Sequence, residues 1–216
     1  VSVYTKLKDW EALQELTPIL KKQGIFDESN LRELEVNAFL AQLEKLRFRQ
    51  KMGQDPHALL DELQSIWKKL DSVAKDEPMQ VLYATTLIEF GDETKAESFI
   101  RTSLNNHWSD ALAAVYGQLT NVSMQKSLAN AETWIRRHPE SAPLYLATGR
   151  ICQRLQLWGK ARDYYEKALQ YDASSEALIE LSALLEAMGD VDIAQSLIVK
   201  RIQNDSLSVK ALPLPK

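Results

Sequence analysis

The sequence predicts an all-α protein in which antiparallel helical hairpins stack into a right-handed superhelix of about eleven helices. Three observations support this. The chain of 216 residues has only seven glycines and seven prolines, which leaves little turn chemistry for a many-stranded sheet. Hydrophobic residues make up 45% of the chain and charged residues 26%, so a continuous core is expected. Small and large apolar residues also recur about every 33 positions, which is typical of stacked helical hairpins.

Residues 1–76 show helical patterns of irregular length, which we expect to continue the array of hairpins. The first hairpin, around Trp10, resembles a repeat whose leading helix is truncated. A long helix is expected to begin after a capping side chain near Asp27 and to end at about Gly53. The next helix is expected to start at Asp55 and Pro56, because Asp is a good N-cap and Pro fits the first helical turn.

Four repeats are predicted over residues 77–208. Gly149 aligns with Ser182, and Ala161 aligns with Ala194, in each case 33 residues later. Small residues at such positions let two antiparallel helices approach closely, and the neighbouring hairpin covers the apolar faces that remain. The four repeats are expected at about 77–107, 108–141, 142–174 and 175–208.

The charge pattern argues against a nucleic-acid partner. Lysine and arginine number 26 and aspartate and glutamate 30, which gives a net charge of −4, whereas phosphate-backbone binding requires a basic excess. The one basic cluster, Lys45 to Lys51, lies at the end of a predicted helix, where cations are favoured. No apolar run approaches the roughly 18 residues of a membrane span. The tail, residues 209–216, contains Pro213 and Pro215 and is expected to be flexible or extended.

No catalytic or cofactor signature is present, so we expect a protein without enzymatic activity. Cys152 is the only cysteine, so no intrachain disulfide can form, and we expect it to be a small buried residue. The three histidines show no metal-binding spacing. The glycines lie at least 10 residues apart, which excludes a nucleotide-binding glycine loop. We therefore expect no metal and no resident cofactor.

The concave side of the array is the candidate binding surface, because the first helix of each hairpin faces it. Apolar and aromatic positions there lie beside Arg150 and Arg154, which would bind a partner carboxylate in bidentate fashion. The alternative is that both arginines pair within the chain, with Asp110, Glu180 or Glu186. The predicted partner-binding groove consists of Thr85, Leu112, Tyr116, Leu146, Arg150, Gln153, Arg154, Ile179 and Glu186.

The repeat over 142–174 resembles the tetratricopeptide motif, with an aromatic residue, glycine and alanine at the motif's positions. The segments Tyr145–Cys152 and Leu157–Arg162 are similar to the bacterial HemY-type family, which is associated with haem biosynthesis. The most specific element is Leu-Trp-Gly-Lys-Ala-Arg in the second segment, and the likeness spans nearly the whole chain. This chain would correspond to the soluble C-terminal repeat region of that family.

This resemblance implies a bacterial inner-membrane protein whose N-terminal anchor is absent from this chain and whose repeats lie on the cytoplasmic side. It implies an interaction scaffold with protein partners, among them enzymes of late haem synthesis. The alternative is a protein that binds and transfers haem or porphyrin, with His57, His107, His138, Cys152 or a tyrosine as the axial ligand. A flavin-dependent protoporphyrinogen oxidase shares the family's name, and the lack of a dinucleotide fingerprint excludes it.

Overall fold

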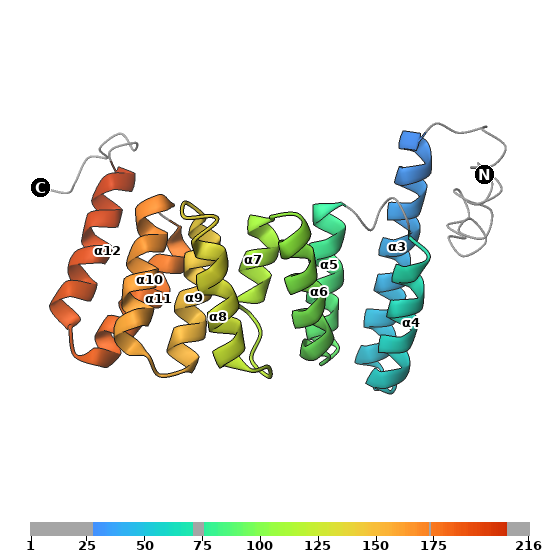
Figure 1. Ribbon diagram of the computed structural model, residues 1–216, viewed down its shortest axis with the longest axis horizontal. Coiled ribbons are helices and arrows are strands. Elements are labelled where there is room, and N and C mark those ends of the chain that lie inside the picture. The colour runs from blue at the N-terminus through green and yellow to red at the C-terminus, as the bar shows by residue number, and fades with distance from the viewer. Residues whose placement is uncertain (1–27, 71–75, 173, 207–216) are drawn as a thin grey trace, which may run out of the picture. The chain divides into compact units, whose positions relative to one another are not determined.

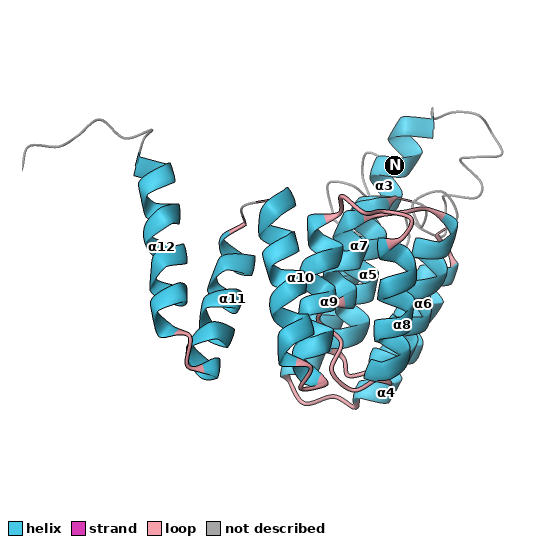
Figure 2. Cartoon of the chain, turned by 60° about the vertical axis from the view of Figure 1, so that its left-hand side comes forward, coloured by secondary structure: helices cyan, strands magenta, loops and turns pink. Residues whose placement is uncertain are grey.

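The computed structural model describes residues 28–70, 76–172 and 174–206. Within these residues the chain forms ten helices, labelled α3 to α12 in Figure 1, and no strand (Figure 2). The expectation of an all-α fold is therefore confirmed. The chain divides into two compact units, an N-terminal unit that ends at Ser103 and a C-terminal unit that begins at Leu104. The expected hairpin around Trp10 and the tail 209–216 lie outside the described residues.

The helices of the N-terminal unit begin and end where the local chemistry predicts. The Asp55 carboxylate accepts a hydrogen bond from the His57 N–H at 3.2 Å, and Pro56 is the first residue of the next helix. Gly53 follows the long first helix with a φ of 82°, a value that glycine adopts without strain. The helices are α3 (Glu28–Lys51), α4 (Pro56–Lys68), α5 (Glu77–Glu89) and α6 (Glu93–Asn106), the last of which runs across the division.

Aromatic rings form the centre of the N-terminal unit. The Trp67 ring stacks on the Tyr83 ring with centroids 4.2 Å apart and an angle of 8° between the planes. The rings of Phe39 and Phe99 lie 5.7 Å and 5.6 Å from Trp67, in tilted and edge-on contact. Burial, with a smaller contribution from Asp92, raises the pKa of Tyr83 to about 12. The ring cluster therefore joins α3, α4, α5 and α6 through large side chains.

The C-terminal unit uses serine caps at the start of the first helix of each hairpin. The hydroxyl oxygens of Ser109, Ser141 and Ser174 accept hydrogen bonds from backbone N–H groups three residues later, at 3.0 to 3.3 Å. The helices of this unit are α7 (Asp110–Tyr116), α8 (Met124–Ile135), α9 (Ala142–Arg154), α10 (Trp158–Tyr171), α11 (Ser175–Met188) and α12 (Val191–Ser206).

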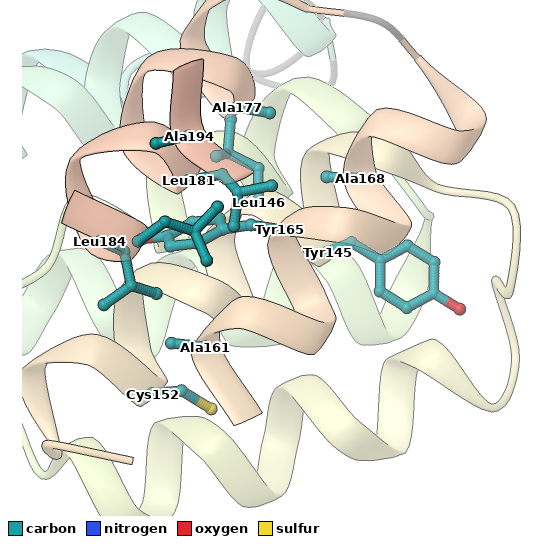
Figure 3. Close-up of a cluster of buried hydrophobic side chains, with 11 residues drawn as sticks. Tyr145, Leu146, Cys152, Ala161, Tyr165, Ala168, Ala177, Leu181, Leu184 and Ala194 are labelled. Carbon is teal, nitrogen blue, oxygen red and sulfur yellow. The ribbon is translucent and has the colours of Figure 1, made fainter. Parts of the chain in front are cut away.

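Small residues set the distance between helices in this unit. A Cβ atom added to Gly149 would lie 2.6 Å from the Tyr165 ring, and one added to Gly117 would lie 2.6 Å from the Cα of Ala147. Only glycine fits at these two contacts, which join α9 to α10 and α7 to α9. Ala161 is fully buried in the same core (Figure 3). The chain is thus an all-α helical-repeat protein of the tetratricopeptide-like class.

The expectation that Cys152 is a buried residue is confirmed. Trp158, at the start of α10, is 45% exposed and is not a core residue. Among the described helices, none combines the length and the apolar composition that a bilayer span requires.

Candidate partner-binding surface

Three residues of the predicted groove are core residues. Leu112 and Tyr116 are 1% exposed, and Leu146 is 6% exposed. The Tyr116 hydroxyl accepts a hydrogen bond from the Asn130 side-chain amide at 3.2 Å, and its ring meets Trp134 edge-on at 4.9 Å. These side chains hold neighbouring helices together. The prediction that Leu112, Tyr116 and Leu146 contact a partner is therefore wrong, because packing against neighbouring helices buries their side chains.

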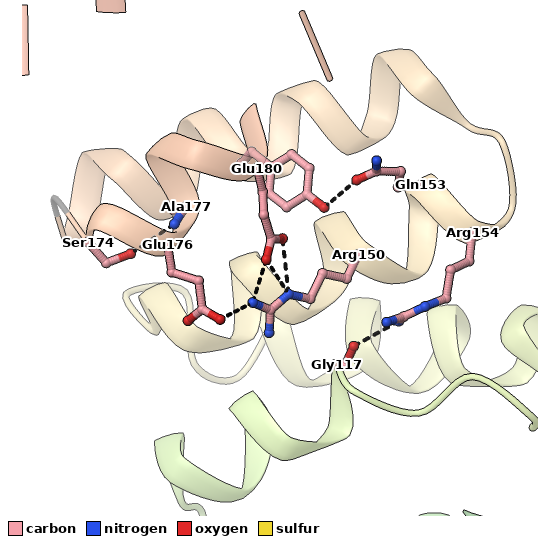
Figure 4. A network of polar contacts seen from close by, with 9 residues as sticks. Gly117, Arg150, Gln153, Arg154, Ser174, Glu176, Ala177 and Glu180 are labelled. Atoms are coloured by element: carbon pink, nitrogen blue, oxygen red, sulfur yellow. Dashed lines mark hydrogen bonds and ion pairs between the residues drawn. The ribbon is translucent and has the colours of Figure 1, made fainter. Parts of the chain in front are cut away.

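Arg150 is engaged within the chain. Its Nε donates to both carboxylate oxygens of Glu180 at 3.0 Å, and its Nη2 donates to Glu180 at 2.6 Å and also to Glu176 (Figure 4). The Arg150 side chain is only 13% exposed. Burial lowers its pKa, but the hydrogen bonds and charges of Glu180 and Glu176 outweigh burial and raise it. The intrachain alternative therefore describes Arg150, whose bidentate fork is occupied by Glu180.

The next turn of α9 is also tied to its neighbours. The Gln153 side-chain oxygen accepts a hydrogen bond from the Tyr165 hydroxyl at 2.7 Å, and the Arg154 Nη1 donates to the Gly117 carbonyl at 2.7 Å (Figure 4). Burial, followed by the charge of Glu180, raises the pKa of Tyr165. These bonds link α9 to α10 and to the end of α7. They keep the polar side of α9 in one geometry.

The open part of the surface lies on α11. Glu176, Ile179, Ala183 and Glu186 are spaced by three or four residues, so they share one face of the helix. We call these four residues the α11 stripe. All four residues are exposed. Ile179, the one large apolar residue among the four, is 66% exposed. The stripe therefore offers an apolar centre between two carboxylates, beside the fixed polar side of α9.

The predicted site is thus brought together only in part. Arg150 and the α11 stripe meet through Glu176, and Gln153 lies one turn further along α9. Thr85 belongs to the N-terminal unit, where its hydroxyl donates to the Val81 carbonyl at 2.8 Å. Its membership of the groove stays a prediction.

Sequence reasoning missed Glu176 and named Glu180 only as an alternative partner. A signal for both exists in the repeat length. Glu180 and Glu176 lie 30 and 26 positions after Arg150, about one and two turns nearer the start of the next first helix than the aligned position. Acidic residues on those two turns of α11 therefore meet the arginine.

The residues considered as haem ligands have different surroundings. His57 and His107 are exposed, and the half-buried His138 stacks on Trp108 with ring centroids 3.9 Å apart. Burial raises the pKa of the Cys152 thiol to about 11. Over the part of the chain that the structure describes, no group of three or more His, Cys, Asp or Glu side chains is arranged to hold a metal ion.

The fold is shared with solved proteins, although the sequence matches no family model and no curated protein. One similar structure is MamA from Desulfovibrio magneticus RS-1, from its residue 41 to its end. It is 16% identical with a TM-score of 0.50, over 83% of this chain and 97% of that one. Another is BtubC from P. vanneervenii, which is 18% identical with a TM-score of 0.55, over 100% of this chain and 96% of that one. Likeness at these identities shows the fold alone.

Proposed function

We propose that this protein is a non-enzymatic interaction scaffold, without a resident cofactor, that binds partner proteins through α9 and α11 of the C-terminal unit. The observation that supports this is the α11 stripe. Ile179 is 66% exposed at the centre of a helix whose neighbouring positions Leu181 and Leu184 are buried. An apolar side chain exposed between two carboxylates matches the anchor and polar rim of a protein interface.

The rest of the surface is suited to binding because it is already ordered. Arg150 is held by Glu176 and Glu180, and Gln153 is held by Tyr165. A partner would therefore meet side chains that have lost their rotamer freedom on folding, which lowers the entropy cost of association. The acidic residues of the stripe favour a partner that carries positive charge.

We further propose that the partners include enzymes of late haem synthesis, and that an N-terminal anchor holds the protein at the bacterial inner membrane. We place the repeats on the cytoplasmic side. The support is the resemblance of Leu157–Arg162 and of the flanking repeat to the HemY-type family. The net charge of −4 supports protein partners over nucleic acid.

The test is site-specific photo-crosslinking of the full-length protein in its native cells. A photoreactive residue at Ala183, in the α11 stripe, is compared with one at Asp163, which is exposed on α10. We expect defined protein adducts from position 183 and not from position 163, with haem-pathway enzymes among them by mass spectrometry. Identical adducts from both positions, or none from 183, would contradict the scaffold. Defined adducts without haem enzymes would remove only the haem context.

A further inference from the structure

Successive first helices pack on one another in a repeated way. Leu146 of α9 lies in the buried cluster that also contains Ala177 and Leu181 of α11, and it is 6% exposed (Figure 3). The residue that aligns with Leu146 one repeat later is Ile179. Ile179 is 66% exposed. The same repeat position is therefore covered by α11 on helix α9, but is exposed to solvent on helix α11.

The second helices show the same difference. Tyr165 of α10 is fully buried, whereas the residue that aligns with it on α12, Ile198, is 37% exposed. Ile198 on α12 is thus open at a position whose counterpart is buried in the preceding hairpin.

The charges on α11 indicate which kind of helix would bind to its exposed face. On α9, Arg150 meets two glutamates of the helix that covers it, Glu176 and Glu180. On α11 the residue aligned with Arg150 is Ala183, and Glu186 takes the position of Gln153. A covering helix with acids at the positions of Glu176 and Glu180 would therefore find no arginine and would be repelled by Glu186. A covering helix with basic residues there would be attracted.

We propose that the α11 stripe and Ile198 form the docking site for a basic amphipathic α-helix of a partner protein, which binds as the next first helix of the array. Its apolar side carries a small residue and a leucine spaced like Ala177 and Leu181, and its flank carries lysine or arginine opposite Glu186. This mode is helix-in-groove recognition. The inference rests on the proposed function, whose partner it describes chemically.

The occupant is assigned to a basic partner helix because of the charge of the face. Ile179 is 66% exposed between the exposed carboxylates of Glu176 and Glu186. Lysine or arginine on a docked helix would complement these carboxylates.

The probe for the test is a fluorescent synthetic peptide with the sequence of residues 174–189, in which Glu176→Lys and Glu180→Lys supply the basic flank. Its binding to the full 216-residue chain is followed by fluorescence anisotropy. We expect saturable binding that Ile179→Asp weakens at least roughly tenfold, because a charge would replace the buried anchor. Met52→Asp is the matched control, since Met52 is 69% exposed in the N-terminal unit, and it should leave the affinity unchanged.

A charge exchange tests the electrostatic part. Glu186→Lys should weaken binding of the basic peptide. The unmodified 174–189 peptide, which keeps both glutamates, should bind the Glu186→Lys chain more tightly than the unchanged chain. Circular dichroism of each variant confirms that the fold is retained, which the exposure of Glu186 leads us to expect.

Four results would overturn the inference. They are the absence of saturable binding, an equal loss of affinity with Met52→Asp, a dimer of the chain alone that Ile179→Asp dissociates, and a more than tenfold gain in affinity when residues 207–216 are removed. The third would assign the face to a second copy and the fourth to the chain's own tail. Protein adducts at Ala183 in cells, without binding of the peptide, would support the scaffold and contradict only the docking of a basic helix. Binding of the peptide, without adducts in cells, would support the docking of a basic helix and contradict the scaffold.

Discussion

The N-terminal unit packs its helices around large aromatic rings, whereas the C-terminal unit packs them on small residues. In the first, Trp67 lies among Phe39, Tyr83 and Phe99. In the second, Gly149 lets α9 touch the Tyr165 ring of α10. Small residues give one close helix spacing that successive hairpins can reuse, while a ring cluster fits one arrangement only. This explains why the 33-residue period is clear in the C-terminal unit and weak before it.

The ion pairs of the two units differ in the same sense. In the N-terminal unit, Arg47 pairs with Glu89 through side chains that are 35% and 41% exposed. In the C-terminal unit, Arg150 is 13% exposed and Glu180 is 27% exposed. Water screens the first pair, so the second contributes more to the position of its helices. The regular unit therefore also carries the more specific polar contact.

The largest effect is expected from Trp67→Ala in the N-terminal unit. Removal of a ring that contacts three other aromatic side chains should lower the free energy of unfolding by about 3–5 kcal/mol. The measurement is urea denaturation followed by circular dichroism. Trp158→Ala is the control, because Trp158 is 45% exposed, and it should cost under about 1 kcal/mol. Equal losses for the two variants would show that the ring cluster does not hold the unit.

A smaller effect is expected where the C-terminal unit depends on glycine. Gly149→Ala places a Cβ 2.6 Å from the Tyr165 ring and should cost about 1–3 kcal/mol, as overpacking does. Gly159→Ala meets no atom within 4 Å and should be neutral or stabilising, by up to about 1 kcal/mol. Labelling of the thiol of Cys152 reports on this unit, because the residue is buried and is the only cysteine. Labelling should be faster in Gly149→Ala alone, and unchanged rates would refute the close-contact account.

The smallest effects on stability are expected from the loss of single ion pairs, and these effects should differ between the two units. Arg150→Met leaves Glu180 partly buried without its fork and should cost about 1 kcal/mol or slightly more. Arg47→Met should lower the free energy of unfolding by less, by roughly 0.2–1 kcal/mol, which is the usual contribution of an exposed ion pair. Thermal unfolding in low and high salt measures both. If Arg47→Met proved the more damaging, the contrast between the units would be wrong.

Much of the fold could be predicted from sequence because its signals are local or periodic. The cap at Asp55 follows from a short motif, and the close approach of two helices at Gly149 follows from the alignment of repeats. The burial of Leu112, Tyr116 and Leu146 could not be predicted in this way. The first helix of a hairpin has one side that faces the concave side of the array and an adjacent side that the next helix covers. Residues on both sides recur with the same period, so the period does not distinguish them. Only the neighbouring helix shows which side a residue occupies.

The candidate site was less predictable than the fold because its chemistry depends on residues far apart in the chain. Arg150 could pair with a partner or with an acid of α11, and the spacing alone favoured neither. The structure decides for Glu180 and Glu176 because the serine cap at Ser174 fixes where α11 begins. The openness of Ile179 likewise depends on the absence of a covering helix at that position among the described residues.

The serine caps of the C-terminal unit have a consequence for how such an array can grow. Ser109, Ser141 and Ser174 each set the starting point of a hairpin by a bond confined to a single turn. A hairpin that carries its own start signal can be duplicated, deleted or exchanged without shifting the phase of those that follow. Changes in the length of this array during evolution would then occur in whole hairpins.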